Sequence, residues 1–237
     1  MAGHSKWANI KHRKERADAK KGKIFSRVTK EIISAVKQGG SDPKSNPKLR
    51  LALQKAKEVN LPNDNIERNI KKAASSEQAD YTEMTYEMYG HGGVGIIIEL
   101  MTDNKNRTAS DMRIATNKRG GSIAAPGAVS YNFDQKGIIQ VEKKGSFEDF
   151  FEKVLEVGAE DVEEVEDLFI VTVAPEQLYQ IKDQLVSLGY KVEDANLEMI
   201  PKTIVEVSDE HKLANYALIE WLEALEDVDA VYHNMKE

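Results

Sequence analysis

The chain has 237 residues, 41% hydrophobic and 31% charged, which is enough to bury one or two hydrophobic cores. It contains no cysteine, which excludes a disulfide framework, a thiol nucleophile and cysteine-ligated metal sites. No apolar stretch approaches the ~20 residues of a membrane span, and the first seven residues are too polar to start a secretory signal. We therefore expect a cytoplasmic protein with no membrane partner.

The formal net charge of -7 conceals a separation of charge along the chain. Residues 1–80 hold 19 Lys and Arg against 9 Asp and Glu, a net charge of +10, whereas the other 157 residues have a net charge of -17. Ten of the basic residues lie within positions 1–30, beside only Glu15 and Asp18. This segregation predicts a basic arm that binds a polyanion, and the alternative is a solvated tail that improves solubility.

Three helices are predicted in the N-terminal part of the chain. Residues 1–23 lack helical periodicity and are expected to be extended or only partly helical until a ligand binds them. Apolar residues then recur at helical spacing within 24–36, and a glycine pair follows. Asn46 offers an N-cap for a second helix over 47–60, and a third covers 63–74. Short helices with tight connections form a small antiparallel bundle.

Beyond residue 80 the pattern changes to mixed strands and helices. Strands are predicted at 85–89 and 94–101, joined by a glycine turn, and a further strand at 128–133. A helix over 105–118, which Asp103 or Asn104 can cap, lies between them. These elements begin a second structural module.

Residues 136–199 have an order of their own, which reads strand, helix, strand, strand, helix, strand. This βαββαβ order is typical of the ferredoxin-like fold, and Ser146 with Asp149 forms a predicted capping box for its first helix. The elements that follow, a strand at 203–207, a helix from about 209 to 226 and a strand at 230–233, have no sheet of their own. The economical solution is that they complete the sheet begun before residue 134, which makes the βαββαβ unit an insertion.

The sequence thus predicts an α+β protein, in which an N-terminal three-helix bundle precedes two α/β modules and the second module is a ferredoxin-like insertion in the first. The predicted domains are the basic arm and bundle (1–79), a discontinuous α/β domain (80–134 plus 201–237) and an acidic ferredoxin-like insertion (135–200). The three N-terminal helices show no unused apolar stripe that would favour dimerisation, so no oligomer is expected.

The motifs of catalysis and cofactor binding find little support. The glycine pattern at 90–95 matches a dinucleotide fingerprint, but an isoleucine-rich strand follows it where a helix is required, so a hairpin turn is predicted. A lone loop histidine such as His91 is usually solvated, and the five histidines form no zinc pair. The acidic run at 160–167 lacks calcium-loop spacing and is expected at a solvated strand edge and turn. We expect no enzyme, no cofactor, no metal and no small-molecule substrate.

The basic arm is the best candidate site, because lysine and arginine pair with phosphates and a tryptophan can stack on a base. A second basic cluster lies on the helix and loop that follow the strand at 94–101. The candidate nucleic-acid-binding residues are Lys6, Trp7, Lys11, His12, Arg13, Lys14, Arg16, Lys20, Lys21, Lys23, Arg27, Arg107, Arg113, Lys118 and Arg119.

Blocks spread over the whole chain resemble the YebC/PmpR family, whose members are described as probable transcriptional regulators and, in mitochondria, as translational activators of cytochrome c oxidase. The blocks are the opening MAGHSKWANIKHRK, then NPKLRLA from Asn46, PNDNIER from Pro62, TDNKNRT from Thr102 and VYHN from Val231. The resemblance implies three domains, a helical N-terminal domain and association with nucleic acid or ribosomes. It implies no catalytic centre, and a start at the signature itself favours a bacterial cytosolic member.

Two functions remain open at this point. The first is a transcriptional regulator that binds DNA through its basic N-terminal module. The second is a ribosome-associated translation factor that binds ribosomal RNA through the same surface. A scaffold working through the acidic insertion is a distant third.

Overall fold

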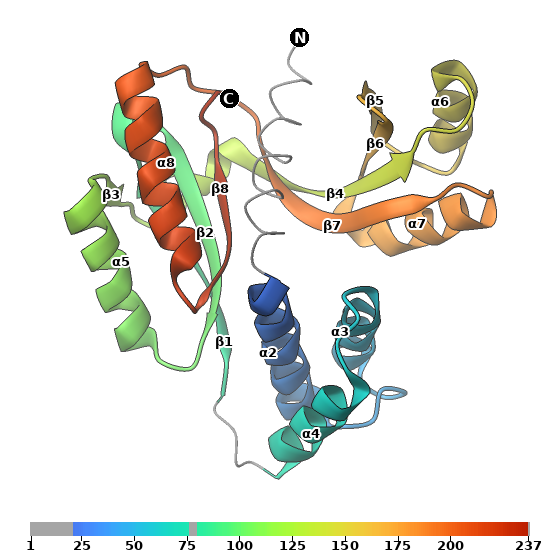
Figure 1. Cartoon of the computed structure of the whole chain (residues 1–237), viewed down its shortest axis with the longest axis horizontal. Helices are drawn as coiled ribbons and strands as arrows, with labels where there is room; N and C mark the ends of the chain where they lie inside the picture. The colour runs from blue at the N-terminus through green and yellow to red at the C-terminus, as the bar shows by residue number, and fades with distance from the viewer. Residues whose placement is uncertain (1–20, 76–79, 237) are drawn as a thin grey trace. The chain divides into compact units, whose positions relative to one another are not determined.

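A computed structural model describes residues 21–75 and 80–236 of the chain. These residues fall into two compact units: residues 130–204, and residues 21–129 together with 205–235. The second, larger unit contains the helical bundle and a sheet, and the smaller contains a sheet of its own. The predicted α+β class is confirmed, and Figure 1 shows the order of the elements along the chain.

The bundle consists of α2 (Lys21–Gly39), α3 (Pro47–Glu58) and α4 (Asn63–Ala74). Asn46 caps α3 as predicted, because its Oδ1 accepts a hydrogen bond from the N–H of Leu49 at 3.1 Å. Its amide also donates to the carbonyl oxygens of Ala35 and Gly40, which closes the turn between α2 and α3. The apolar stripes of the three helices share one core, centred on the fully buried Ile32 and Leu49.

The sheet of the larger unit has the order β3-β1-β2-β8. Its strands are β1 (Thr82–Tyr89), β2 (Gly95–Thr102), the two-residue β3 (Ser122–Ile123) and β8 (Val228–His233). Two helices, α5 (Lys105–Arg119) and α8 (Asp209–Ala224), pack against one face through a core of isoleucine, leucine and methionine side chains. Strand β8 pairs with β2 although some 125 residues separate them, so the predicted return of the chain is confirmed.

The smaller unit is a ferredoxin-like βαββαβ fold, as predicted. Its strands are β4 (Phe133–Glu142), β5 (Asp161–Val165), β6 (Leu168–Val173) and β7 (Val192–Pro201), in the order β5-β6-β4-β7 with all pairs antiparallel. Its helices α6 (Phe147–Glu156) and α7 (Leu178–Ser187) cover one face, where Phe150 and Phe169 stack with ring centroids 4.3 Å apart. Strand β5 forms an edge of the sheet, where the acidic run was expected.

Several boundaries differ from the sequence prediction. The strand expected at 128–133 is a 3₁₀ turn, Ser130–Asn132, from which β4 continues directly. The strand expected at 203–207 is reduced to a single parallel bridge between Val205 and Met235. Both segments alternate in sequence like strands, but each joins the two units and lacks a long partner strand.

The glycine pattern at 90–95 forms the predicted turn. A short 3₁₀ helix, His91–Gly93, connects β1 to β2, and Gly92 has a φ of +70°, in the left-handed region that favours glycine. The prediction that His91 is merely solvated is wrong. Its Nε2 lies 2.8 Å from the carbonyl oxygen of Arg119, and its backbone N–H donates to Asn215, so this residue links three segments of the larger unit.

Candidate nucleic-acid interface

Part of the predicted site lies outside the residues that the structure describes. These candidates are Lys6, Trp7, Lys11, His12, Arg13, Lys14, Arg16 and Lys20 of the basic arm. Lys21 begins α2, but its side chain is also outside the described part. The candidates that the structure places are Lys23 and Arg27 on α2 and Arg107, Arg113, Lys118 and Arg119 on α5.

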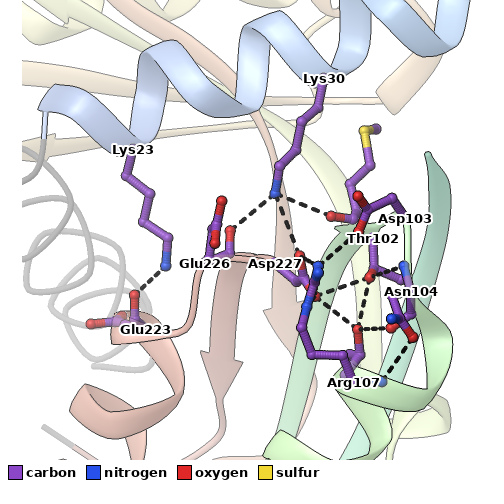
Figure 2. Close-up of polar contacts among 11 residues, drawn as sticks. Lys23, Lys30, Thr102, Asp103, Asn104, Arg107, Glu223, Glu226 and Asp227 are labelled. Atoms are coloured by element: carbon purple, nitrogen blue, oxygen red, sulfur yellow. Dashed lines mark hydrogen bonds and ion pairs between the residues drawn. The ribbon is translucent and has the colours of Figure 1, made fainter. Parts of the chain in front are cut away.

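The basic side chains of α2 contact acceptors of their own unit (Figure 2). The ammonium of Lys23 donates to the backbone carbonyl of Glu223 at the end of α8. The guanidinium of Arg27 donates to Glu31 at 3.3 Å. Burial opposes the charging of Arg27, but the nearby carboxylates of Asp229 and Glu31 outweigh it, so the pKa of Arg27 lies above its ordinary value. Both candidates therefore have a structural role.

Lys30, which the sequence did not single out, is buried on α2, with 5% of its surface exposed. Its ammonium donates to the carbonyl oxygens of Met101 at 3.2 Å and Glu226 at 3.0 Å, and lies 3.9 Å from a carboxylate oxygen of Asp227. The ammonium thus makes two hydrogen bonds to carbonyl oxygens and lies at ion-pair distance from one carboxylate. Lys30 fixes α2 to the end of β2 and to the turn between α8 and β8.

Asp227, which Lys30 approaches, has several partners of its own. Its carboxylate accepts hydrogen bonds from the hydroxyls of Thr102 and Thr108, both at 2.9 Å. Arg107 donates to both carboxylate oxygens through Nη2, at 2.8 and 2.9 Å, and to Asp103 at 2.8 Å. Its hydrogen bond to Asp227 raises the pKa of Arg107, so the guanidinium stays charged. The TDNKNRT block therefore builds a buried carboxylate site.

The remaining candidates on α5 differ from Arg107, which is bound to Asp227 and Asp103, because they have no carboxylate partner among the described residues. Arg113 and Lys118 make no ion pair with any described residue, although both are exposed. The guanidinium of Arg119 lies 5.1 Å from the ring centroid of Trp221, a cation–π contact that holds the side chain while its surface remains exposed. Lys118 and Arg119 lie in the last turn of α5, and Arg113 lies in the middle of the same helix.

The structure also identifies exposed cations that sequence reasoning left out of the site. They lie on α3, on α4 and in the loop before α3, on the side away from the bundle core. Within the described part of the chain none of them pairs with a carboxylate. We call them the α3–α4 cations: Lys44, Lys48, Arg50, Lys57, Arg68, Lys71 and Lys72. The sequence could have identified those on α3 and α4, because the apolar spacing of these helices predicts that their basic residues face away from the core.

Charge divides the described chain as it divides the sequence. Residues 21–75 carry a net charge of +8, and residues 130–204 carry a net charge of -10. Phosphate is therefore attracted to the bundle and repelled by the ferredoxin-like unit. Among the described residues no three His, Asp or Glu side chains gather in a way that could hold a metal ion. No helix in the described ranges has the length and apolar character needed to cross a membrane.

Two family models together match most of the chain. The model of the TACO1/YebC protein N-terminal domain matches residues 5–76, and that of the TACO1/YebC second and third domain matches residues 81–235. A probable transcriptional regulatory protein of Protochlamydia amoebophila is 67% identical over 237 residues, covering 100% of this chain and 97% of the relative. A probable transcriptional regulatory protein of Chlamydia pneumoniae is 60% identical, covering 99% and 100%.

A solved structure agrees with this relationship. The crystal structure of a conserved hypothetical protein, Aq1575 of Aquifex aeolicus, superposes with a TM-score of 0.80 at 42% identity, covering 92% of this chain and 91% of that one. The sequence relatives thus match nearly the whole chain, and the solved structure matches its fold over 92% of its length. The chain belongs to the TACO1/YebC family.

Proposed function

We propose that this protein is a nucleic-acid-binding regulator of gene expression that holds DNA through its phosphate backbone. The observation that carries the proposal is the set of α3–α4 cations, which are exposed and have no carboxylate partner among the described residues. Its relatives bear the name probable transcriptional regulatory protein, which supports a regulatory role. The basic arm adds six further Lys and Arg, in residues 1–20, that can pair with phosphates.

The cations of the bundle fall into two groups according to the contacts of their side chains. Lys23, Arg27 and Lys30 on α2 are bound to carbonyls and carboxylates of the larger unit, so phosphate could reach them only by breaking those contacts. The α3–α4 cations are exposed and pair with no carboxylate among the described residues, so phosphate can approach them without breaking an ion pair. Hydrated lysine ammoniums pair readily with phosphates, and this pairing releases the counterions condensed on the nucleic acid.

The chemistry of these side chains favours backbone contact over base reading. Base-specific contacts in the major groove are made most often by arginine, whose planar fork matches guanine. Here Arg50 donates to the carbonyl of Pro43 at 3.2 Å, and Arg68 donates to Asn65 at 2.7 Å, so both forks have local partners. The other five α3–α4 cations are lysines, which act as point charges and bind phosphate without reading sequence.

That same observation supports a second candidate, a ribosome-associated translation factor. A surface that binds phosphates without reading bases suits ribosomal RNA as well as DNA, since the RNA major groove is closed to side chains and its backbone is recognised instead. The two candidates share the surface and differ in the nucleic acid that occupies it.

The test is a titration of the full chain with a short fluorescent DNA duplex over a range of salt concentrations. The variant K71Q/K72Q removes two exposed cations of α4, and the control K144Q/K153Q removes two exposed cations of the acidic unit. The α4 variant should bind more weakly and flatten the slope of log affinity against log salt by about 1.8, while the control keeps the slope of the parent. Equal slopes for the parent and the α4 variant would rule out this surface.

A further inference from the structure

The ferredoxin-like unit has a hollow on the sheet face that its helices leave uncovered. It measures about 290 Å³ and crosses all four strands of that sheet. Side chains on β4, β6 and β7 supply an apolar floor of Ile138, Ile170, Ile200 and Pro201. The hollow is about twice the ~150 Å³ cavity that takes a benzene molecule, so it has room for one bulky aromatic side chain. We call it the β-face groove.

The rim of the β-face groove is acidic. Asp134, Glu160, Asp161 and Glu163 line it, against two lysines. Lys136 is bound to Glu160 at 2.7 Å, and Lys202 is bound to Asp134 at 3.0 Å. Two carboxylates more than ammoniums therefore surround an apolar floor, inside a unit whose net charge is -10. The complementary ligand is a cationic segment that also carries a large apolar side chain.

We infer that the β-face groove binds the basic N-terminal arm of the same chain, with Trp7 seated on the floor, and that this contact competes with nucleic acid. The arm has the required chemistry, because Trp7 and Ile10 stand among Lys6, Lys11, Arg13, Lys14 and Arg16. The fourteen residue steps from Trp7 to Lys21 can span up to about 45–50 Å when extended, which exceeds the size of a small domain, so the arm can reach a groove on its own molecule.

The groove then competes with the phosphates of nucleic acid for the arm. An arm held by carboxylates cannot meet a nucleic-acid backbone, so the apparent affinity falls by the fraction of molecules in which the arm is free. Dense nucleic acid, or a salt concentration that screens the pairing, releases it. This consequence rests on the proposed function, whereas the docking of the arm does not.

Docking is tested without nucleic acid, through the fluorescence of Trp7 in the full chain. Trp7 and Trp221 are the two tryptophans of the sequence, so a W221F background leaves Trp7 as the reporter. In this background Trp7 should be shielded from acrylamide, and D161K/E163K should expose it to the level of a free peptide of residues 1–20. The control E152Q/E156Q changes exposed carboxylates of α6, which covers the opposite face of the sheet, and should leave Trp7 shielded. D161N/E163Q removes the two charges without reversing them and should also expose Trp7 to acrylamide. It serves as the test if the charge reversal disturbs folding.

Binding supplies the second measurement. If the arm is docked in about nine of ten molecules, D161N/E163Q should raise DNA affinity by up to about tenfold, and the control E152Q/E156Q should not match it. Trp7 quenched equally in the parent and in both groove variants would overturn the inference, and so would shielding that disappears on dilution, which would mean docking between copies. Shielded Trp7 in a protein that binds no nucleic acid would instead overturn the proposed function and leave the docking intact.

Discussion

Asp227 and Arg107 form a two-sided ion pair at the junction of the bundle and the sheet, with Nη2 at 2.8 Å from one carboxylate oxygen and 2.9 Å from the other (Figure 2). The carboxylate side chain is 6% exposed and the guanidinium 44% exposed. Lys30 approaches the same carboxylate from α2. One acidic residue thus connects α2, the start of α5 and the start of β8, and its loss should affect all three.

The first prediction is that Asp227→Asn destabilises the larger unit. An amide keeps the shape of the carboxylate but cannot accept charged hydrogen bonds on both oxygens, and bonds to charged groups contribute about 1.5–3 kcal/mol each. Because water screens the exposed side of Arg107, we expect the free energy of unfolding to fall by about 2 kcal/mol. Urea denaturation measures this change.

The control is Asp103→Asn, which removes only the exposed i,i+4 partner of Arg107 and should cost about 0.3–0.5 kcal/mol. The pH dependence gives a second check. Burial alone would raise the pKa of Asp227, but hydrogen bonds from Arg107, Thr108 and Thr102 hold it below its usual range. The stabilisation is therefore present above the ordinary aspartate pKa of ~3.9 and is lost as pH falls through the lower folded value. Equal losses for the two variants would contradict this account.

The second prediction concerns Asp229 on β8. Burial raises the pKa of Asp229 to about 6, although Arg27 and Lys30 oppose the shift. The folded protein then binds a proton more tightly than an unfolded aspartate with a pKa of ~3.9, so the free energy of unfolding should decrease as pH rises from about 4 to about 6. Asp229→Asn should remove this dependence and gain about 1–2 kcal/mol above neutral pH.

Urea denaturation at a series of pH values compares Asp229→Asn with the parent. The variant should have a flatter profile between the two pKa values, and the two curves should converge at acid pH. A variant that is less stable than the parent above neutral pH would mean that the attraction of Arg27 outweighs the cost of burying the charge.

The architecture was predictable because local signals agreed with one another. The N-caps at Ser146 and Asn46 are confirmed, because their side-chain oxygens accept hydrogen bonds from the N–H groups of Asp149 and Leu49. The βαββαβ order follows from periodicity alone. The return of β8 to β2 was predicted because the backbone N–H and C=O groups of a strand need a partner strand. The segments that failed, 128–133 and 203–207, alternate like strands but have no long neighbour, which only the tertiary fold decides.

The candidate site was less predictable than the fold. A sequence shows that Arg107 and Lys23 are basic, but it does not show which acceptors lie opposite them after folding. Asp227 stands some 120 residues from Arg107, and nothing local indicates their pairing. Conversely, the α3–α4 cations form no ion pair with a carboxylate among the described residues. Their charges were visible in the sequence, but the absence of ion pairs was not.

The third prediction concerns the basic arm. If about half of the ten basic residues in 1–30 meet phosphates, log affinity should fall against log salt with a slope of about -4.5 on duplex DNA and about -3.5 on single strands. Deleting residues 1–20 removes six of these residues and should flatten both slopes. A truncated chain that keeps the affinity and slope of the parent would make the arm a solubilising tail.

The last prediction separates the DNA regulator from the ribosome-associated factor. A DNA regulator of the usual kind reads base edges with a helix in the major groove, often as a symmetric dimer with spaced half-sites. The lysines of α3 and α4 suit backbone contact instead, and both arginines of this surface have local partners. We therefore expect any sequence preference on duplex DNA to stay within the ~1–3 kcal/mol of one good base contact, with structured RNA or ribosomes competing for the same surface.

Competition titrations with promoter DNA, scrambled DNA and purified ribosomes, all at one salt concentration, measure this preference. K71Q/K72Q should weaken binding to all three competitors by a similar factor, because a phosphate contact is blind to sequence. K144Q/K153Q should weaken none of them. A preference of about a thousandfold for promoter over scrambled DNA, or about 4 kcal/mol, with ribosomes failing to compete, would instead require base-reading residues that this surface lacks.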